Sequence, residues 1–177
     1  MKFCTNGVKM AGRRMTDVAL LQGKFSGHVA FSQLIRDGLQ SATQQGWQQM
    51  VWCDVNFEDW PLREKVVVDA LYAWAQRGRQ LTMLAHSYES VVRYQPRMVA
   101  FRKTWGHIVD CRLCKQVDVA KFPSIMWSPV WAVKRTEFDS CSGFATSDVR
   151  KRVQLQEELR ECQRHSSPGF PATVLGL

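Results

Sequence analysis

Apolar residues between positions 29 and 78 recur with the three- to four-residue spacing of amphipathic helices. The first set predicts a helix over about 29–44 that ends at Gly46, with a buried face of Phe31, Leu34, Ile35 and Leu39. A second helix is expected after Pro61, because proline suits a first turn and Asp59 can cap the free N–H groups there. Gly78 fits the position beyond its last turn, and its buried face consists of Leu62, Val66, Ala70, Leu71 and Trp74.

Short apolar runs elsewhere predict buried strands. The expected strands cover residues 17–21, 50–55, 81–85, 107–111, 125–127 and 130–133. Two short helices are expected over about 88–94 and 97–105, on either side of Pro96. A final helix over about 146–164 is expected to bury Val149, Val153, Leu159 and Cys162.

Strands that alternate with helices favour an α/β fold. We therefore expect a three-layer sandwich, in which helices flank both faces of a mostly parallel sheet. Residues 1–16 form a flexible basic lead-in, residues 17–165 a single α/β domain, and residues 166–177 a turn-rich linker whose end can dock as a last strand.

Composition indicates a basic globular protein. The 177 residues suit one domain, 45% of them are hydrophobic, and the formal net charge is +8. The start lacks the apolar segment of a secretory signal, and no stretch approaches the ~20 apolar residues of a membrane helix. We therefore expect a cytoplasmic protein with no membrane partner, in which the six cysteines are reduced thiols. No pattern predicts a cofactor.

Two segments carry a resemblance to a known family. The stretch from Phe31 to Ala85 has the order helix, strand, helix, strand, and its second helix leads through Ala70-Leu71-Tyr72-Ala73-Trp74-Ala75-Gln76-Arg77-Gly78-Arg79-Gln80 into Leu81-Thr82-Met83-Leu84. About fifty residues later, Ala132, Lys134 and Asp139 stand at the spacing of the phosphodiesterase signature H-x-K-x-x-x-x-D. Over about residues 17–145 the chain thus resembles a half-domain of the phospholipase D-like superfamily.

This resemblance implies a degenerate active site. In the family two such motifs, from two halves or a dimer, supply one histidine that attacks phosphorus and a second that protonates the leaving group. Here position 132 is alanine, and none of the four histidines stands two residues before a lysine. The resemblance therefore implies that nucleophilic catalysis of this type is lost.

Cations alternate with aromatic residues from Arg93 to His107. Arginine and lysine bind phosphate backbones, and unpaired bases stack on aromatic rings. The candidate phosphate- or nucleic-acid-binding residues are Arg93, Arg97, Arg102, Lys103 and Lys134. The alternative is that Phe101 and Trp105 belong to the core and the arginines cover them.

A second group of candidates is acidic. Asp54, Glu58 and Asp59 follow one predicted strand and His86 follows the next, so Asp54 and His86 are the candidate catalytic pair if the protein is an enzyme, with Arg97 beside them. The alternative reading has Asp54 ending a strand and Asp59 capping a helix. His107, Cys111 and Cys114 have a metal-like spacing, but no second pair of ligands follows, and no metal is predicted.

The sequence thus favours a protein that is not an enzyme and that binds nucleic acid or another phosphate-bearing partner. One alternative is a small enzyme that acts on an anionic substrate at Asp54 and His86. Another is an interaction module that forms a homodimer through a tryptophan-rich surface.

Overall fold

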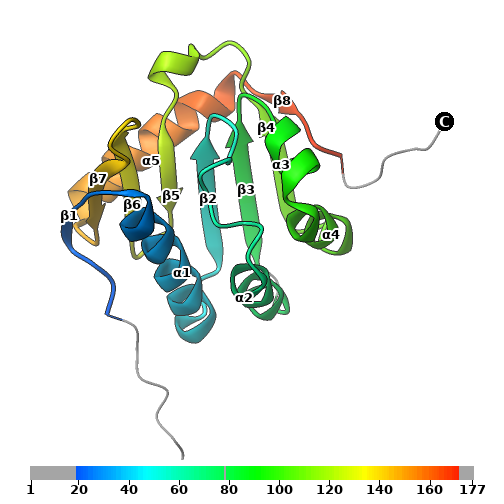
Figure 1. Ribbon diagram of the computed structural model, residues 1–177, viewed down its shortest axis with the longest axis horizontal. Coiled ribbons are helices and arrows are strands. Elements are labelled where there is room, and N and C mark those ends of the chain that lie inside the picture. Colours follow the sequence, from blue (N-terminus) through cyan, green and yellow to red (C-terminus); the bar gives the residue numbers. More distant parts are fainter. Residues whose placement is uncertain (1–18, 78, 172–177) are drawn as a thin grey trace, which may run out of the picture.

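The chain folds around one eight-stranded sheet with the strand order β1-β7-β6-β5-β2-β3-β4-β8 (Figure 1). The computed structural model describes residues 19–77 and 79–171. The strands are β1 (Gly23–Phe25), β2 (Gln49–Asp54), β3 (Gln80–Ala85), β4 (Val109–Leu113), β5 (Ser124–Trp127), β6 (Ala132–Glu137), β7 (Ser142–Thr146) and β8 (Ser167–Pro168). The helices of the described residues are α1 (His28–Gln45), α2 (Lys65–Ala75), α3 (Glu89–Tyr94), α4 (Pro96–Thr104), α5 (Val149–Arg164) and the short 3₁₀-helix η1 (Val119–Lys121).

The sheet is mostly antiparallel, so the predicted mostly parallel sheet is wrong. Only the pairs β2–β3 and β3–β4 are parallel. Strands β5, β6 and β7 follow one another through connections of a few residues, and each pairs antiparallel with the next. The physical reason is connection length, because a parallel return needs a crossover of a dozen or more residues.

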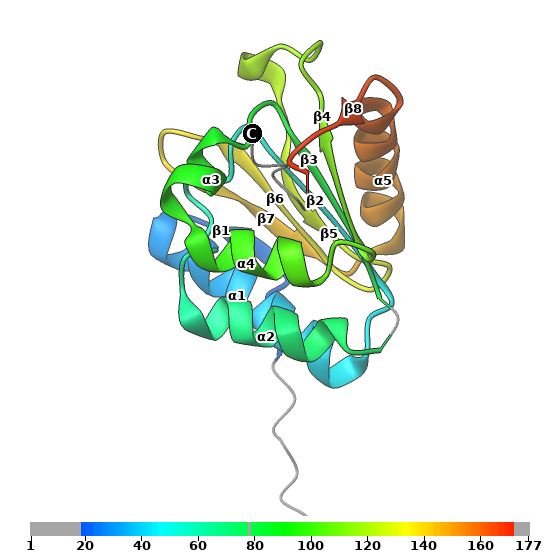
Figure 2. The same ribbon diagram turned by 90° about the vertical axis from the view of Figure 1, so that its right-hand side faces the viewer.

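Helices cover both faces of the sheet unequally (Figure 2). Helices α1 to α4 lie on one face and α5 lies on the other. The larger core cluster lies under α1 to α4, and a smaller one, which includes Leu155 and Leu159 of α5, lies on the opposite face. Six of the seven tryptophans are buried and Trp105 is half-buried, so the described residues offer no tryptophan-rich surface for a homodimer.

Several local predictions need correction. Helix α2 begins at Lys65 after Glu64, so Asp59 does not cap it. Val149 and Val153 of α5 are 63% and 51% exposed, and this helix instead buries Leu155, Leu159 and Cys162. The described part of the predicted strand 17–21 is not a strand, and the first strand is β1.

Strand β7 was not predicted, because glycine and serine interrupt its apolar pattern. Gly143 lies so close to Lys134 of β6 that a Cβ atom would overlap the backbone there. The lead-in 1–16 and the proposed docking strand beyond Pro171 lie outside the described residues. Within the described residues, no helix is long and apolar enough to span a membrane.

Candidate functional site

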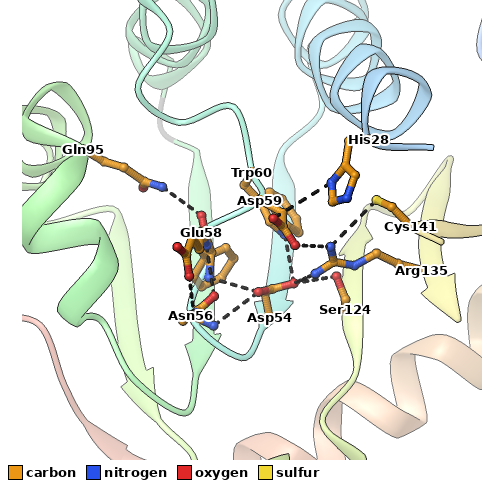
Figure 3. Close-up of polar contacts among 11 residues, drawn as sticks. His28, Asp54, Asn56, Glu58, Asp59, Trp60, Gln95, Ser124, Arg135 and Cys141 are labelled. Atoms are coloured by element: carbon orange, nitrogen blue, oxygen red, sulfur yellow. Dashed lines mark hydrogen bonds and ion pairs between the residues drawn. The ribbon is translucent and has the colours of Figure 1, made fainter. Parts of the chain in front are cut away.

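A buried polar network lies where the carboxyl end of β2 meets the start of β5 and the end of β6 (Figure 3). Its centre is Asp54, which is 1% exposed. Asp54 Oδ1 accepts hydrogen bonds from the backbone N–H groups of Asn56, at 3.2 Å, and Phe57, at 3.0 Å. Asp54 Oδ2 accepts from Trp60 Nε1 at 3.1 Å and from Ser124 Oγ at 2.5 Å.

Arg135 supplies the charge that balances this carboxylate. Its Nη2 donates to Asp54 Oδ2 at 3.0 Å and its Nη1 donates to Asp59 Oδ2 at 2.6 Å. The guanidinium also lies over the rings of Phe31 and Phe138, at 5.1 and 4.6 Å from their centroids. Burial by itself would lower the pKa of Arg135, but the charge of Asp54 and the hydrogen bond to Asp59 outweigh burial and raise this pKa.

The network organises the loop that follows β2. Phe57 has a left-handed backbone with φ of 57°, which is unfavourable for a bulky residue. Two side chains hold it, because Asp54 accepts from its N–H group and Gln95 Nε2 donates to its carbonyl oxygen at 2.8 Å. The loop thereby contacts the junction between α3 and α4 through Gln95 and contacts β6 through Arg135.

Asp54 and His86 lie on neighbouring strand ends without facing each other. The partner Trp60 of Asp54 belongs to the core under α1 to α4. The ring of His86 packs edge-on against Phe122, which belongs to the core under α5, at 6.3 Å between centroids. The oxygens of Asp54 are fully occupied by five donors, so its geometry is that of a structural carboxylate and not of a free base.

Two of the three residues at the H-x-K-x-x-x-x-D spacing, Ala132 and Lys134, lie on the side of the sheet that α5 covers. Ala132 is fully buried in the cluster that contains Leu155 and Leu159. Lys134 Nζ lies 2.7 Å from Glu158 Oε2 of α5, with both side chains partly exposed. The third position, Asp139, is exposed in the turn after β6. A lysine paired in this way has its charge balanced by the protein itself.

The candidate phosphate-binding residues fall into two groups. Arg102 is 9% exposed and donates to the carbonyl oxygens of Gly106 and Phe170 at 3.1 and 3.3 Å, so its donors hold the backbone together. Arg93, Arg97 and Lys103 are exposed on α3 and α4, the face of the sheet opposite to Lys134 (Figure 2).

The exposed arginines Arg93 and Arg97 share a surface with Tyr94 and Arg63, which were not among the predicted binding residues. Tyr94 is 59% exposed, and the guanidinium carbon of Arg93 lies 6.0 Å from its ring centroid. Arg97 Nη1 donates to the carbonyl oxygen of Arg63 at 2.9 Å. Arg63 was missed because it lies 34 residues before Arg97, in the loop before α2, where no local pattern marks it. We call Arg63, Arg93, Tyr94 and Arg97 the arginine–tyrosine surface.

A pocket of about 350 Å³ opens beside this surface. It is lined by Glu58, Arg63, Ser90, Tyr94 and Gln95. Gln95 is 3% exposed, and its Oε1 atom is buried with no hydrogen-bond partner in the described part of the chain. The surface therefore combines cations, an accessible aromatic ring and a small hollow.

The metal-like trio does not converge. His107 is exposed, while Cys111 and Cys114 belong to the two different core clusters. Among residues 19–77 and 79–171, no group of three or more His, Cys, Asp or Glu side chains is arranged to hold a metal ion. Burial raises the pKa of Cys111 to about 12 and that of Cys114 to about 11, so both thiols stay protonated at neutral pH.

No protein-family model matches the sequence, and no curated protein matches it. Two solved structures share the fold at low sequence identity. TrmBL2, an archaeal chromatin protein described with a novel mode of DNA binding, matches with a TM-score of 0.63 and 12% identity over 88% of this chain. This chain spans 57% of the length of TrmBL2. NucT from Helicobacter pylori matches with a TM-score of 0.56 and 10% identity, over 83% of this chain and 97% of NucT.

Proposed function

We propose that this protein is a non-catalytic nucleic-acid-binding module, and that single-stranded nucleic acid contacts the arginine–tyrosine surface. The observation that carries the proposal is Tyr94, an accessible ring with Arg93 beside it and Arg63 and Arg97 within reach. Proteins that bind single strands combine cations that follow the backbone with rings on which bases stack.

The charges of the surface suit a phosphate backbone. Arg93 pairs with Glu89 at 2.8 Å, but both side chains are more than half exposed, so this pair contributes little and a phosphate can compete for the arginine. Arg63 and Arg97 are exposed, and neither forms a salt bridge with a described residue. Lys103 lies further along α4, where a longer single-stranded nucleic acid can reach it.

The fold supports this class of partner without specifying it. TrmBL2, which shares this fold, is an archaeal chromatin protein described with a novel mode of DNA binding. We propose that this chain is related to the phospholipase D-like half-domain and has lost the catalytic function, because Ala132 stands in the position of the histidine and is packed against the core. Under this proposal the protein binds nucleic acid without cleaving it.

The test is fluorescence polarisation with labelled single-stranded and duplex oligonucleotides at 50 and 200 mM salt. The matched variants are Arg63→Ala/Arg97→Ala and, as a control of equal charge, Arg160→Ala/Arg164→Ala on the opposite face. If both arginines contact phosphates, the first variant should lower the slope of log affinity against log salt by roughly 1.4, at about 0.7 per phosphate contact. The control should bind like the parent protein.

Tyr94→Ala isolates the stacking contribution. We expect a loss of about 1–3 kcal/mol in binding free energy for the single strand and a smaller loss for the duplex, whose bases are already stacked. Absence of binding at 50 mM salt, or equal losses in the test and control double variants, would contradict the proposal.

A further inference from the structure

A second pocket lies where the parallel strands β3 and β4 end, away from the arginine–tyrosine surface. It has a volume of about 350 Å³ and is lined by His86, Ser87, Tyr88, Leu113, Lys115 and Phe170. His86 and Ser87 directly follow β3, and Lys115 follows β4 by two residues. Ligands of α/β proteins commonly bind beyond the carboxyl ends of parallel strands, where side chains of neighbouring strands converge.

One side of the pocket is polar. The Nδ1 atom of His86 is buried with no hydrogen-bond partner in the described part of the chain. A buried imidazole nitrogen without a partner costs free energy, which a hydrogen bond to a ligand would recover. Ser87 Oγ accepts from the N–H group of Glu89 at 3.2 Å, which leaves its own proton free to donate. Lys115 adds an exposed positive charge.

The other side is apolar and held in place. Phe170 stacks on Tyr88 at 5.2 Å between centroids, and its carbonyl oxygen accepts from Arg102 Nε. Gly169 donates its N–H group to the carbonyl oxygen of Cys111 at 2.9 Å, and a Cβ atom there would collide with the side chain of Leu113. These contacts fix the wall formed by Leu113 and Phe170 before any ligand arrives.

Tyr88 belongs to this fixed wall, because its hydroxyl group is hydrogen-bonded within the protein. Its hydroxyl donates to the carbonyl oxygen of Met83 at 2.7 Å and lies 3.2 Å from that of Arg112. Burial raises the pKa of Tyr88 well above its ordinary value, so the phenol stays neutral. The polar side chains of His86, Ser87 and Lys115 and the pre-formed apolar wall thus line one hollow of small-ligand size.

We propose that this pocket binds a small phosphomonoester, with the phosphate at Lys115, Ser87 and His86 and an apolar or aromatic group against Leu113 and Phe170. The site is independent of the arginine–tyrosine surface, because the two share no residue. Inorganic phosphate alone should bind more weakly than an aryl phosphate, because only the latter reaches the apolar wall.

The test is isothermal titration of the full chain with phenyl phosphate, inorganic phosphate and benzoate. Lys115→Gln removes the charge at the pocket, and Lys121→Gln removes an exposed lysine of η1 as the matched control. We expect phenyl phosphate to bind about tenfold more weakly to Lys115→Gln than to the parent, as the loss of one charge-assisted hydrogen bond requires. Lys121→Gln should bind like the parent.

A second readout locates the ligand. The imidazole signals of His86, assigned by their loss in His86→Gln, should shift as phenyl phosphate is added. Absence of saturable binding at millimolar phenyl phosphate, or an equal loss in both lysine variants, would overturn the proposal. Equal binding of benzoate would overturn the phosphate assignment. Oligonucleotide binding should be unchanged in Lys115→Gln, so the result is separable from the test of the proposed function.

Discussion

Arg135 and Asp54 form an ion pair in which the two side chains are 2% and 1% exposed. The pair joins the end of β6 to the end of β2 across β5. Trp60 and Asp59 extend it over the loop after β2, and Ser124 joins it to the start of β5. A buried charge without its partner is costly, so this contact constrains the whole polar end of the sheet.

Replacement of Arg135 should therefore destabilise the fold strongly. We expect Arg135→Met to lower the free energy of unfolding by about 3–5 kcal/mol, because the buried Asp54 loses its balancing cation. Urea unfolding measures the change. Arg93→Met, which breaks an exposed pair with Glu89, should change it by no more than about 0.5 kcal/mol. A small effect at Arg135 would show that solvent reaches Asp54.

A histidine at position 132 should not give the protein phosphodiesterase activity. Ala132 is fully buried between the sheet and α5, so Ala132→His inserts a larger polar ring into a packed core. We expect a loss of about 1–3 kcal/mol or more in unfolding free energy and no hydrolysis of bis(p-nitrophenyl) phosphate. Turnover above that of the parent protein would contradict the structural placement of position 132.

The Arg36–Glu64 contact predicts a specific response to acid. The hydrogen bond from Arg36 lowers the pKa of Glu64 below its ordinary value of 4.5. A lowered carboxyl pKa stabilises the fold above the unfolded value, and the contribution disappears as pH falls through the folded value. Both side chains are about one-third exposed, so we expect Glu64→Gln to cost only about 0.5–1 kcal/mol at pH 7. Urea unfolding should show this difference declining as pH falls below 4.5 and vanishing below the lowered pKa of folded Glu64.

The buried thiols predict a loss of stability in alkali. Burial raises the pKa of Cys111 to about 12 and of Cys114 to about 11, against an ordinary value of 9.0. Unfolded thiols ionise from pH 9 upward while the folded ones keep their protons, so the stability that these groups contribute is complete below pH 9 and declines above it. The free energy of unfolding should fall as pH rises above 9, and less steeply in Cys111→Ala/Cys114→Ala. Parallel declines in both proteins would assign the effect to other groups.

Much of the secondary structure followed from local patterns. The apolar spacing around Phe31 and Leu39 predicted α1, and the run from Met50 predicted β2, because each pattern depends only on residues close in the chain. The predicted start of α2 was wrong, because Asp59 does not cap the helix. Its carboxylate instead pairs with Arg135, which is 76 residues away in the chain. No local rule reveals that competition.

The direction of the strands and the make-up of the candidate sites could not be predicted either, because both depend on contacts between residues far apart in the chain. The basic charge, the α/β class and several elements, such as α1 and β2, followed from the amino-acid sequence alone. The tertiary structure was needed to show that β5 to β7 run antiparallel and that Arg102 and Asp54 form hydrogen bonds inside the protein. It was also needed to show that Arg63 and Tyr94 line one pocket. Hydrophobic periodicity reports which side of an element is buried, whereas sites arise from contacts between distant segments that periodicity does not encode.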